Sequence, residues 1–200
     1  CCDWLVTADP HLHRISSLDQ MFTIPAYRVV TAPLLAEWVS NNIPDPILVG
    51  PDSESQQWVA EVAALANLPF EVLRKQRSGD RTVEISVPDT QGLRTGTPVI
   101  LDDIAASGRT LVRTIERLKE VGASQPVCVV IHAVFAEDSY ADILDAGARR
   151  IVTTDSIPHE SNAVGIAPLL AQAIRKFLKL SDPGTVDTGF SKTQNREKRQ

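Results

Sequence analysis

The chain has 200 residues, of which 43% are hydrophobic and 22% are charged, and its formal net charge is −5. This composition suits a globular domain with its own core, and the negative charge excludes the broad basic surface typical of proteins that bind nucleic acids. No apolar run approaches the roughly 20 residues that a membrane-spanning helix needs, so we expect no membrane partner, and the cysteines lack metal-ligand spacing, which indicates a reducing, cytoplasmic setting.

Predicted strands and helices alternate along the chain. The strands are short apolar or alternating runs bounded by turn residues, and they are expected at 4–7, 46–50, 70–74, 82–87, 98–102, 127–134 and 151–153. The helices carry apolar residues at helical spacing, and they are expected at 32–40, 53–67, 108–121, 138–146 and 164–180. Ser53 is the expected N-cap of the second helix. This order predicts an α/β fold with a mostly parallel sheet and helices on both faces.

Three segments lie outside this alternation. Residues 9–14 are expected to form a polar turn, and residues 75–80 a mobile loop between two strands. From residue 181 onward the chain is polar and rich in mixed charges, which predicts disorder. The chain begins with Cys1 almost directly in a predicted strand, so we expect that preceding sequence is missing.

The segment from 99 to 110 has the clearest chemistry. An apolar strand ends in Asp102 and Asp103, a loop of small residues follows, and then a helix begins. Loop amides and a helix N-terminus can hold a phosphate dianion, to which Ser107 and Thr110 can add hydroxyl donors. The two carboxylates can accept hydrogen bonds from vicinal ribose hydroxyls. Because ligands of open α/β sheets bind at the carboxyl ends of strands, the whole pattern predicts a sugar-phosphate site rather than a plain capped turn.

This segment resembles the ribose-phosphate-binding signature of type I phosphoribosyltransferases. The ribose-phosphate pyrophosphokinases share that signature. The resemblance implies that Asp102 and Asp103 hold the ribose. It also implies that the 5-phosphate is held by the loop residues Ala106, Ser107, Gly108, Arg109 and Thr110.

Two earlier segments resemble motifs of the pyrophosphokinases. Residues 9–11 are similar to their Asp-Leu-His motif, with Pro10 in place of leucine, which implies that His11 binds Mg-ATP. Residues 50–52 are similar to a Pro-Asp segment of the family, which implies that Asp52 binds magnesium. The following residues 53–57 depart from the paired glycines and basic residue of that family. From the residues alone, a cap of the next helix is an equal alternative for Asp52.

A third segment carries the basic residues. Lys75 and Arg77 match a lysine and an arginine at the base of the family's catalytic loop. The resemblance implies that both bind ATP and stabilise the negative charge that builds up during transfer. A solvated basic loop is the alternative. Residues 154–158 resemble the family's closing Thr-Asn-Thr-Ile-Pro segment, and for them, as for His132 and His159, we expect a structural role.

Together these segments favour a ribose-phosphate pyrophosphokinase, which moves pyrophosphate from ATP to the anomeric hydroxyl of ribose 5-phosphate with Mg²⁺ as cofactor. The resemblance also implies a homo-oligomer and three regions: the tail of an N-terminal phosphoribosyltransferase-like domain at 1–40, a catalytic domain at 41–180, and a disordered tail at 181–200. One alternative is a salvage phosphoribosyltransferase, whose base-binding hood is not seen after Thr154. The other is a non-catalytic regulatory subunit, against which the intact basic pair and acid pair count.

Overall fold

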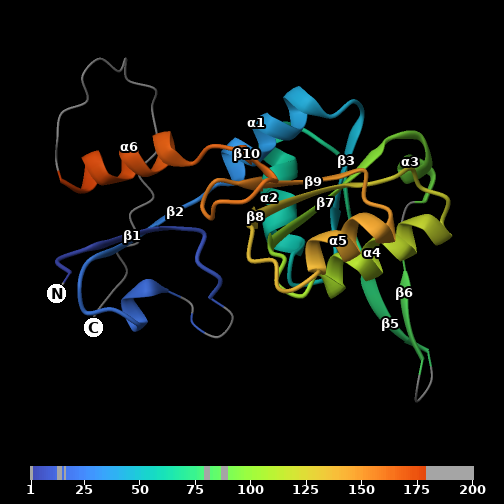
Figure 1. Ribbon diagram of the computed structural model, residues 1–200, viewed down its shortest axis with the longest axis horizontal. Coiled ribbons are helices and arrows are strands. Elements are labelled where there is room, and N and C mark those ends of the chain that lie inside the picture. The colour runs from blue at the N-terminus through green and yellow to red at the C-terminus, as the bar shows by residue number, and fades with distance from the viewer. Residues whose placement is uncertain (1, 13–14, 16, 79–81, 87–89, 179–200) are drawn as a thin grey trace, which may run out of the picture.

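The computed structural model describes residues 2–12, 15, 17–78, 82–86 and 90–178, and of residues 74–78, 82–86 and 90 the backbone alone. Within these ranges a six-stranded, fully parallel sheet has the order β10-β9-β8-β7-β3-β4 (Figure 1). Its strands are β3 (Pro46–Gly50), β4 (Phe70–Val72), β7 (Thr97–Ile104), β8 (Val127–His132), β9 (Arg150–Thr154) and β10 (Asn162–Val164).

Helices cover both faces of this sheet. Along β7, Val99 and Leu101 are buried on the face that α1 (Ala32–Asn42) and α2 (Gln56–Ala66) cover. Ile100 is buried on the opposite face, below α4 (Arg109–Glu120) and α5 (Ser139–Ala146), where the short α3 (Thr90–Thr95) also packs. Alternate residues of a strand point to opposite faces, so a strand between two helical layers is apolar throughout. The predicted α/β fold is confirmed.

A second, smaller sheet lies to one side of the main body (Figure 1). In it β1 (Leu5–Ala8) pairs in parallel with β2 (Ala26–Val29), and a short 3-10 helix, η1 (Leu18–Gln20), lies between them in the chain. The last helix, α6 (Ala167–Phe177), packs on these two strands, with the rings of Trp4 and Phe177 at 5.3 Å. The two ends of the described chain therefore come together beside the main sheet.

An antiparallel hairpin extends from the main body after β4 (Figure 1). It consists of β5 (Arg74–Ser78) and β6 (Thr82–Ser86). The expectation of a mobile loop from residue 75 is therefore wrong for 75–78, because the backbone of these residues pairs with β6. Residues 79–80 lie outside the described ranges, as does the predicted tail at 181–200.

Several element boundaries differ from the sequence prediction. The helix predicted from residue 53 begins at Gln56, so Ser53 is not its N-cap, and Ser55 takes that position. The strand predicted to end at 102 continues to Ile104, because Ile104 still pairs with His132 of β8. The helix predicted from 164 begins at Ala167, because residues 162–164 form β10 along β9. Among the described helices, none has the length and apolar character that crossing a bilayer requires.

Candidate active site

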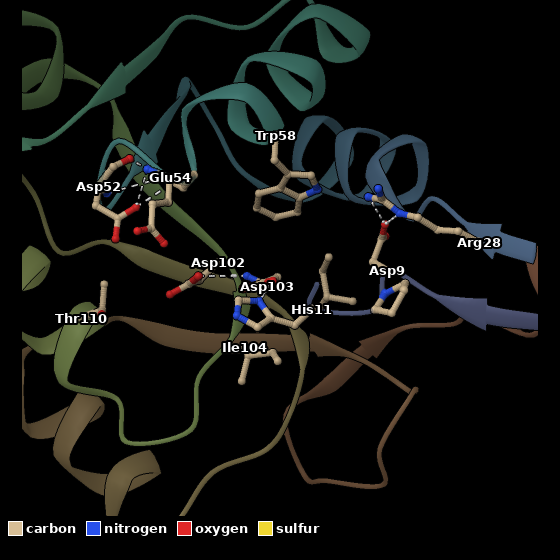
Figure 2. Close-up of a pocket in the computed structure, with 13 residues that line it drawn as sticks. Asp9, His11, Arg28, Asp52, Glu54, Trp58, Asp102, Asp103, Ile104 and Thr110 are labelled. Atoms are coloured by element: carbon tan, nitrogen blue, oxygen red, sulfur yellow. Dashed lines mark hydrogen bonds and ion pairs between the residues drawn. The ribbon is translucent and has the colours of Figure 1, made fainter. Parts of the chain in front are cut away.

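A cavity of about 420 Å³ opens at the carboxyl ends of the central strands (Figure 2). Asp52, which follows β3, and the pair Asp102 and Asp103 in β7 contribute to its wall. Thr110 in the first turn of α4 and His11 from the turn after β1 complete the set of predicted residues that line it. The fold thus brings together residues from three segments that are far apart in the sequence, around His11, around Asp52 and at 102–110.

The two aspartates of β7 differ in their surroundings. The backbone N–H of Asp103 donates to Oδ1 of Asp102 at 3.0 Å. Burial, followed by the neighbouring charge of Asp103, raises the pKa of Asp102 from 3.8 to about 7. At neutral pH a substantial fraction of Asp102 therefore carries a proton, so that it can donate as well as accept a hydrogen bond.

This pKa predicts a pH dependence of stability. The pKa of Asp102 is higher in the folded chain than its ordinary value of 3.8, so its protonated form favours folding. That contribution is fully present below about pH 3.8 and is lost as the pH rises through about 7, in total on the order of 4 kcal/mol. We expect Asp102→Asn, which cannot ionise, to gain stability relative to the wild type across this range. Urea unfolding at a series of pH values measures it, and equal pH profiles would contradict it.

His11 contacts the acid pair directly. Its Nδ1 lies 2.5 Å from Oδ2 of Asp103, and both side chains are partly open to solvent. Figure 2 shows the imidazole ring lying over the end of β7. The turn that carries the Asp-Pro-His segment is therefore folded against the strand that carries the acid pair.

Asp9 is a buried residue that forms hydrogen bonds with three other parts of the chain, and its sequence context did not identify it as functional. It is 4% exposed, and its Oδ1 accepts hydrogen bonds from Nε and Nη2 of Arg28 at 3.1 and 2.8 Å. Its Oδ2 accepts from the backbone N–H and the hydroxyl of Thr31 at 2.6 and 2.7 Å. Its carbonyl oxygen lies 3.1 Å from Nε2 of His132, at the end of β8. Asp9 thus fixes the turn that carries His11 to β2, to the start of α1 and to the main sheet.

Asp52 caps a turn and also lines the cavity. Its Oδ1 accepts hydrogen bonds from the backbone N–H groups of Glu54 and Ser55, at 3.0 and 3.1 Å, and so caps the turn before α2. The same carboxylate lines the cavity (Figure 2). The cap therefore also holds the carboxylate at the edge where Asp102 and Asp103 lie.

The small-residue loop leads from β7 into α4. Gly108 has φ +66, and a Cβ there would lie 3.1 Å from Ile143 and 3.2 Å from the carbonyl oxygen of Ser139, so any other residue would be strained. Thr110 faces the cavity, whereas Ser107 and Arg109 line a neighbouring groove between α4 and α5. The structure therefore does not bring all five predicted loop residues to one cavity wall.

The basic pair can be placed by its backbone alone. Lys75 and Arg77 lie in β5, opposite Ile85 and Val83 of β6. The hairpin begins at the carboxyl end of β4, where the N–H of Leu73 donates to the carbonyl of Gly50 at 2.9 Å. The hairpin thus leaves the sheet at the edge where Asp52 lies.

The segment after β9 has internal hydrogen bonds, as expected for a structural role. The hydroxyl of Thr154 donates to the carbonyl of Ile131 at 2.6 Å, and Oδ1 of Asp155 accepts from the N–H of Ile166 at 2.8 Å. Nδ1 of His132 lies 2.9 Å from the hydroxyl oxygen of Ser156. These bonds join β8, β9 and the start of α6.

The carboxylates that line the cavity fit one mode of Mg²⁺ binding. No group of three histidine, cysteine or carboxylate side chains among the described residues is arranged to enclose a metal ion. The cavity nevertheless carries the carboxylates of Asp52, Glu54, Asp102 and Asp103. Magnesium commonly takes one or two carboxylates and fills its remaining positions with water and substrate phosphates. The side chains fit an ion shared with a substrate, and they do not form a closed protein cage.

Comparisons with known proteins agree with this architecture. Residues 17–171 match the model of the phosphoribosyl transferase domain. The chain is 28% identical to a ribose-phosphate pyrophosphokinase of Methanothermobacter thermautotrophicus over 86% of its own length and 59% of the relative's. It is 30% identical to a ribose-phosphate pyrophosphokinase of Methanosarcina acetivorans over 84% of its own length and 59% of the relative's. The chain thus spans about three fifths of the length of these relatives.

One solved structure supports the fold. The crystal structure of phosphoribosylpyrophosphate synthetase from Mycobacterium smegmatis superposes with a TM-score of 0.72. The superposition covers 90% of this chain and 60% of that one, at 23% sequence identity. At this identity the similarity establishes a shared fold.

Proposed function

The chain belongs to the phosphoribosyl transferase domain family, and within it we propose that it forms the catalytic part of a ribose-phosphate pyrophosphokinase. The reaction is the transfer of pyrophosphate from ATP to the anomeric hydroxyl of ribose 5-phosphate, which yields AMP and phosphoribosyl pyrophosphate. The observation that carries the proposal is the contact between His11 and Asp103. It joins the segment similar to the pyrophosphokinases' ATP-binding motif to the segment similar to the ribose-binding signature.

In this proposal ribose 5-phosphate lies at the end of the cavity next to α4. Asp102 and Asp103 bind the ribose hydroxyls, and the partial protonation of Asp102 lets the pair hold a diol without full mutual repulsion. The amides of residues 106–110 and the positive end of the α4 dipole bind the 5-phosphate. Gly108 allows the tight turn that presents these amides. The anomeric hydroxyl then faces the part of the cavity where His11 lies.

ATP would enter from the side of His11. His11 and Asp52 are the residues that we propose to hold Mg²⁺ together with the nucleotide's phosphates. The ion would supply positive charge to the phosphate oxygens when bound. Lys75 and Arg77 would bind ATP and stabilise the transition state, since their hairpin begins at the same edge of the sheet as Asp52.

The wider architecture is also a proposal. The buried residues of α1, among them Ala32, Leu35 and Val39, pack in the core of the six-stranded sheet. We therefore propose that a boundary between the N-terminal region and the catalytic domain falls before α1 rather than at residue 40. A cytoplasmic location is consistent with the free thiols of Cys2 and Cys128. A homo-oligomer follows from the similarity to the pyrophosphokinases.

Binding of ribose 5-phosphate tests the proposal. Asp103→Ala removes a carboxylate that would accept a hydrogen bond from a ribose hydroxyl. A hydrogen bond to a charged group contributes about 1.5–3 kcal/mol. We expect the affinity for ribose 5-phosphate to fall about ten- to a hundredfold in isothermal titration calorimetry. Asp19→Ala, which changes an exposed carboxylate in η1, is the matched control and should keep wild-type affinity. Unchanged affinity in Asp103→Ala would show that the sugar does not bind at β7.

A further inference from the structure

The cavity wall is unusually acidic for a site that would bind polyphosphate. Five carboxylates line it, from Asp9, Asp52, Glu54, Asp102 and Asp103. Among the described lining residues, Arg28 is the one with a permanent positive charge. Lys75 and Arg77 are not among the residues whose side chains the structure describes. A phosphate chain that enters this cavity therefore meets a single fixed cation on the described wall.

The guanidinium of Arg28 is oriented by Asp9 and is still accessible to solvent. Its Nε and Nη2 each donate to Oδ1 of Asp9, at 3.1 and 2.8 Å, which fixes the plane of the group. The side chain is 50% exposed. Of its five N–H donors these two bonds use one on Nε and one on Nη2, so that both donors of Nη1 remain for another acceptor. Arg28 comes from β2, a strand outside the main sheet.

Both carboxylate oxygens of Asp9 are already occupied by donors of the protein. Arg28 donates to its Oδ1, and the N–H and hydroxyl of Thr31 donate to its Oδ2. Asp9 is 4% exposed, so a ligand would meet the guanidinium and not the carboxylate. The buried aspartate serves as a clamp that orients the arginine.

Figure 2 shows Arg28 on the opposite side of the cavity from Thr110, with His11 and the acid pair between them. We propose that Arg28 binds the polyphosphate chain of the nucleotide, at the end of the cavity opposite the ribose 5-phosphate loop. This inference rests on the proposed function for the identity of the ligand. It adds a binding residue from β2 that none of the recognised motifs contains.

The test uses inorganic tripolyphosphate with Mg²⁺, because this probe has the phosphate chain of ATP and no base or sugar. Its affinity, and that of ribose 5-phosphate, would be measured by calorimetry in the wild type, Arg28→Gln, Arg28→Lys and Arg149→Gln. Arg149 is an exposed arginine just before β9, and its substitution removes the same charge away from the cavity.

We expect Arg28→Gln to weaken tripolyphosphate binding about ten- to a hundredfold, with ribose 5-phosphate affinity unchanged. Arg28→Lys keeps the charge and should recover most of the loss, which a purely structural role of the clamp would not produce. Arg149→Gln should match the wild type.

Three results would overturn the proposal. They are wild-type tripolyphosphate affinity in Arg28→Gln, an equal loss of tripolyphosphate and ribose 5-phosphate binding, and no tripolyphosphate binding by the wild type. If the wild type bound tripolyphosphate but not ribose 5-phosphate, the proposed function would fail while Arg28 remained a phosphate-binding residue.

Discussion

Lys75→Ala should lower the rate of AMP formation from ATP and ribose 5-phosphate about a hundred- to a thousandfold in kcat, with a much smaller change in KM for ATP. Pyrophosphate transfer builds up negative charge on phosphate oxygens, and removal of one preorganised donor to such charge typically costs about 2.7–4 kcal/mol. Lys75 lies three residues after β4, on a hairpin whose first strand pairs with β6. This anchored position suits a cation that acts mainly on the transition state.

Controls separate this effect from a general loss of charge. Lys176→Ala removes an exposed lysine near the end of α6 and should leave the rate unchanged. Lys75→Arg keeps the charge and should recover part of the rate. If Lys75→Ala raises only the KM for ATP, the side chain acts in ground-state binding and the proposed catalytic role is wrong.

Asp9→Ala should destabilise the chain by about 3 kcal/mol, because it leaves buried donors without their acceptor. Thr31 is fully buried, and both its N–H and its hydroxyl donate to Asp9. Arg28 is half-exposed and can recover hydration, which limits its share of the cost. Asp9 also has φ +31, a conformation that aspartate tolerates better than alanine.

Urea unfolding measures this loss. Asp3→Ala, which removes an exposed carboxylate six residues earlier, is the control and should stay within about 0.5 kcal/mol of the wild type. Asp9→Asn keeps the shape and one acceptor oxygen, so we expect an intermediate loss. Wild-type stability in Asp9→Ala would mean that the buried hydrogen bonds of Asp9 contribute nothing to the fold.

The sequence predicts the core of this protein well where local signals agree with the fold. The strand at 46–50 and the helix over 138–146 are bounded by glycine or proline, and the structure places them within a residue of the prediction. The strand β2 and the short β10 were missed because each has few residues and little alternation of its own. Both depend on pairing with another strand, which the pattern of the strand itself does not contain.

Some residues of the candidate site could be predicted from the sequence and others could not. The acid pair and His11 could be found because each belongs to a local motif, and the structure places them in contact across 92 residues. Arg28 could not be found, because a single arginine in a short strand carries no local signal. Its relation to Asp9 exists only once β1 and β2 lie side by side. The feature that identifies Arg28 is its ion pair with Asp9, a buried aspartate directly after β1.

The most direct test of the account is phosphorus NMR of the chain incubated at high concentration with ATP, ribose 5-phosphate and Mg²⁺. We expect AMP and phosphoribosyl pyrophosphate to form in equal amounts, and only when both substrates are present. If no AMP formed while phosphoribosyl pyrophosphate and a nucleobase were converted to a nucleotide and pyrophosphate, the proposed pyrophosphokinase activity would be wrong.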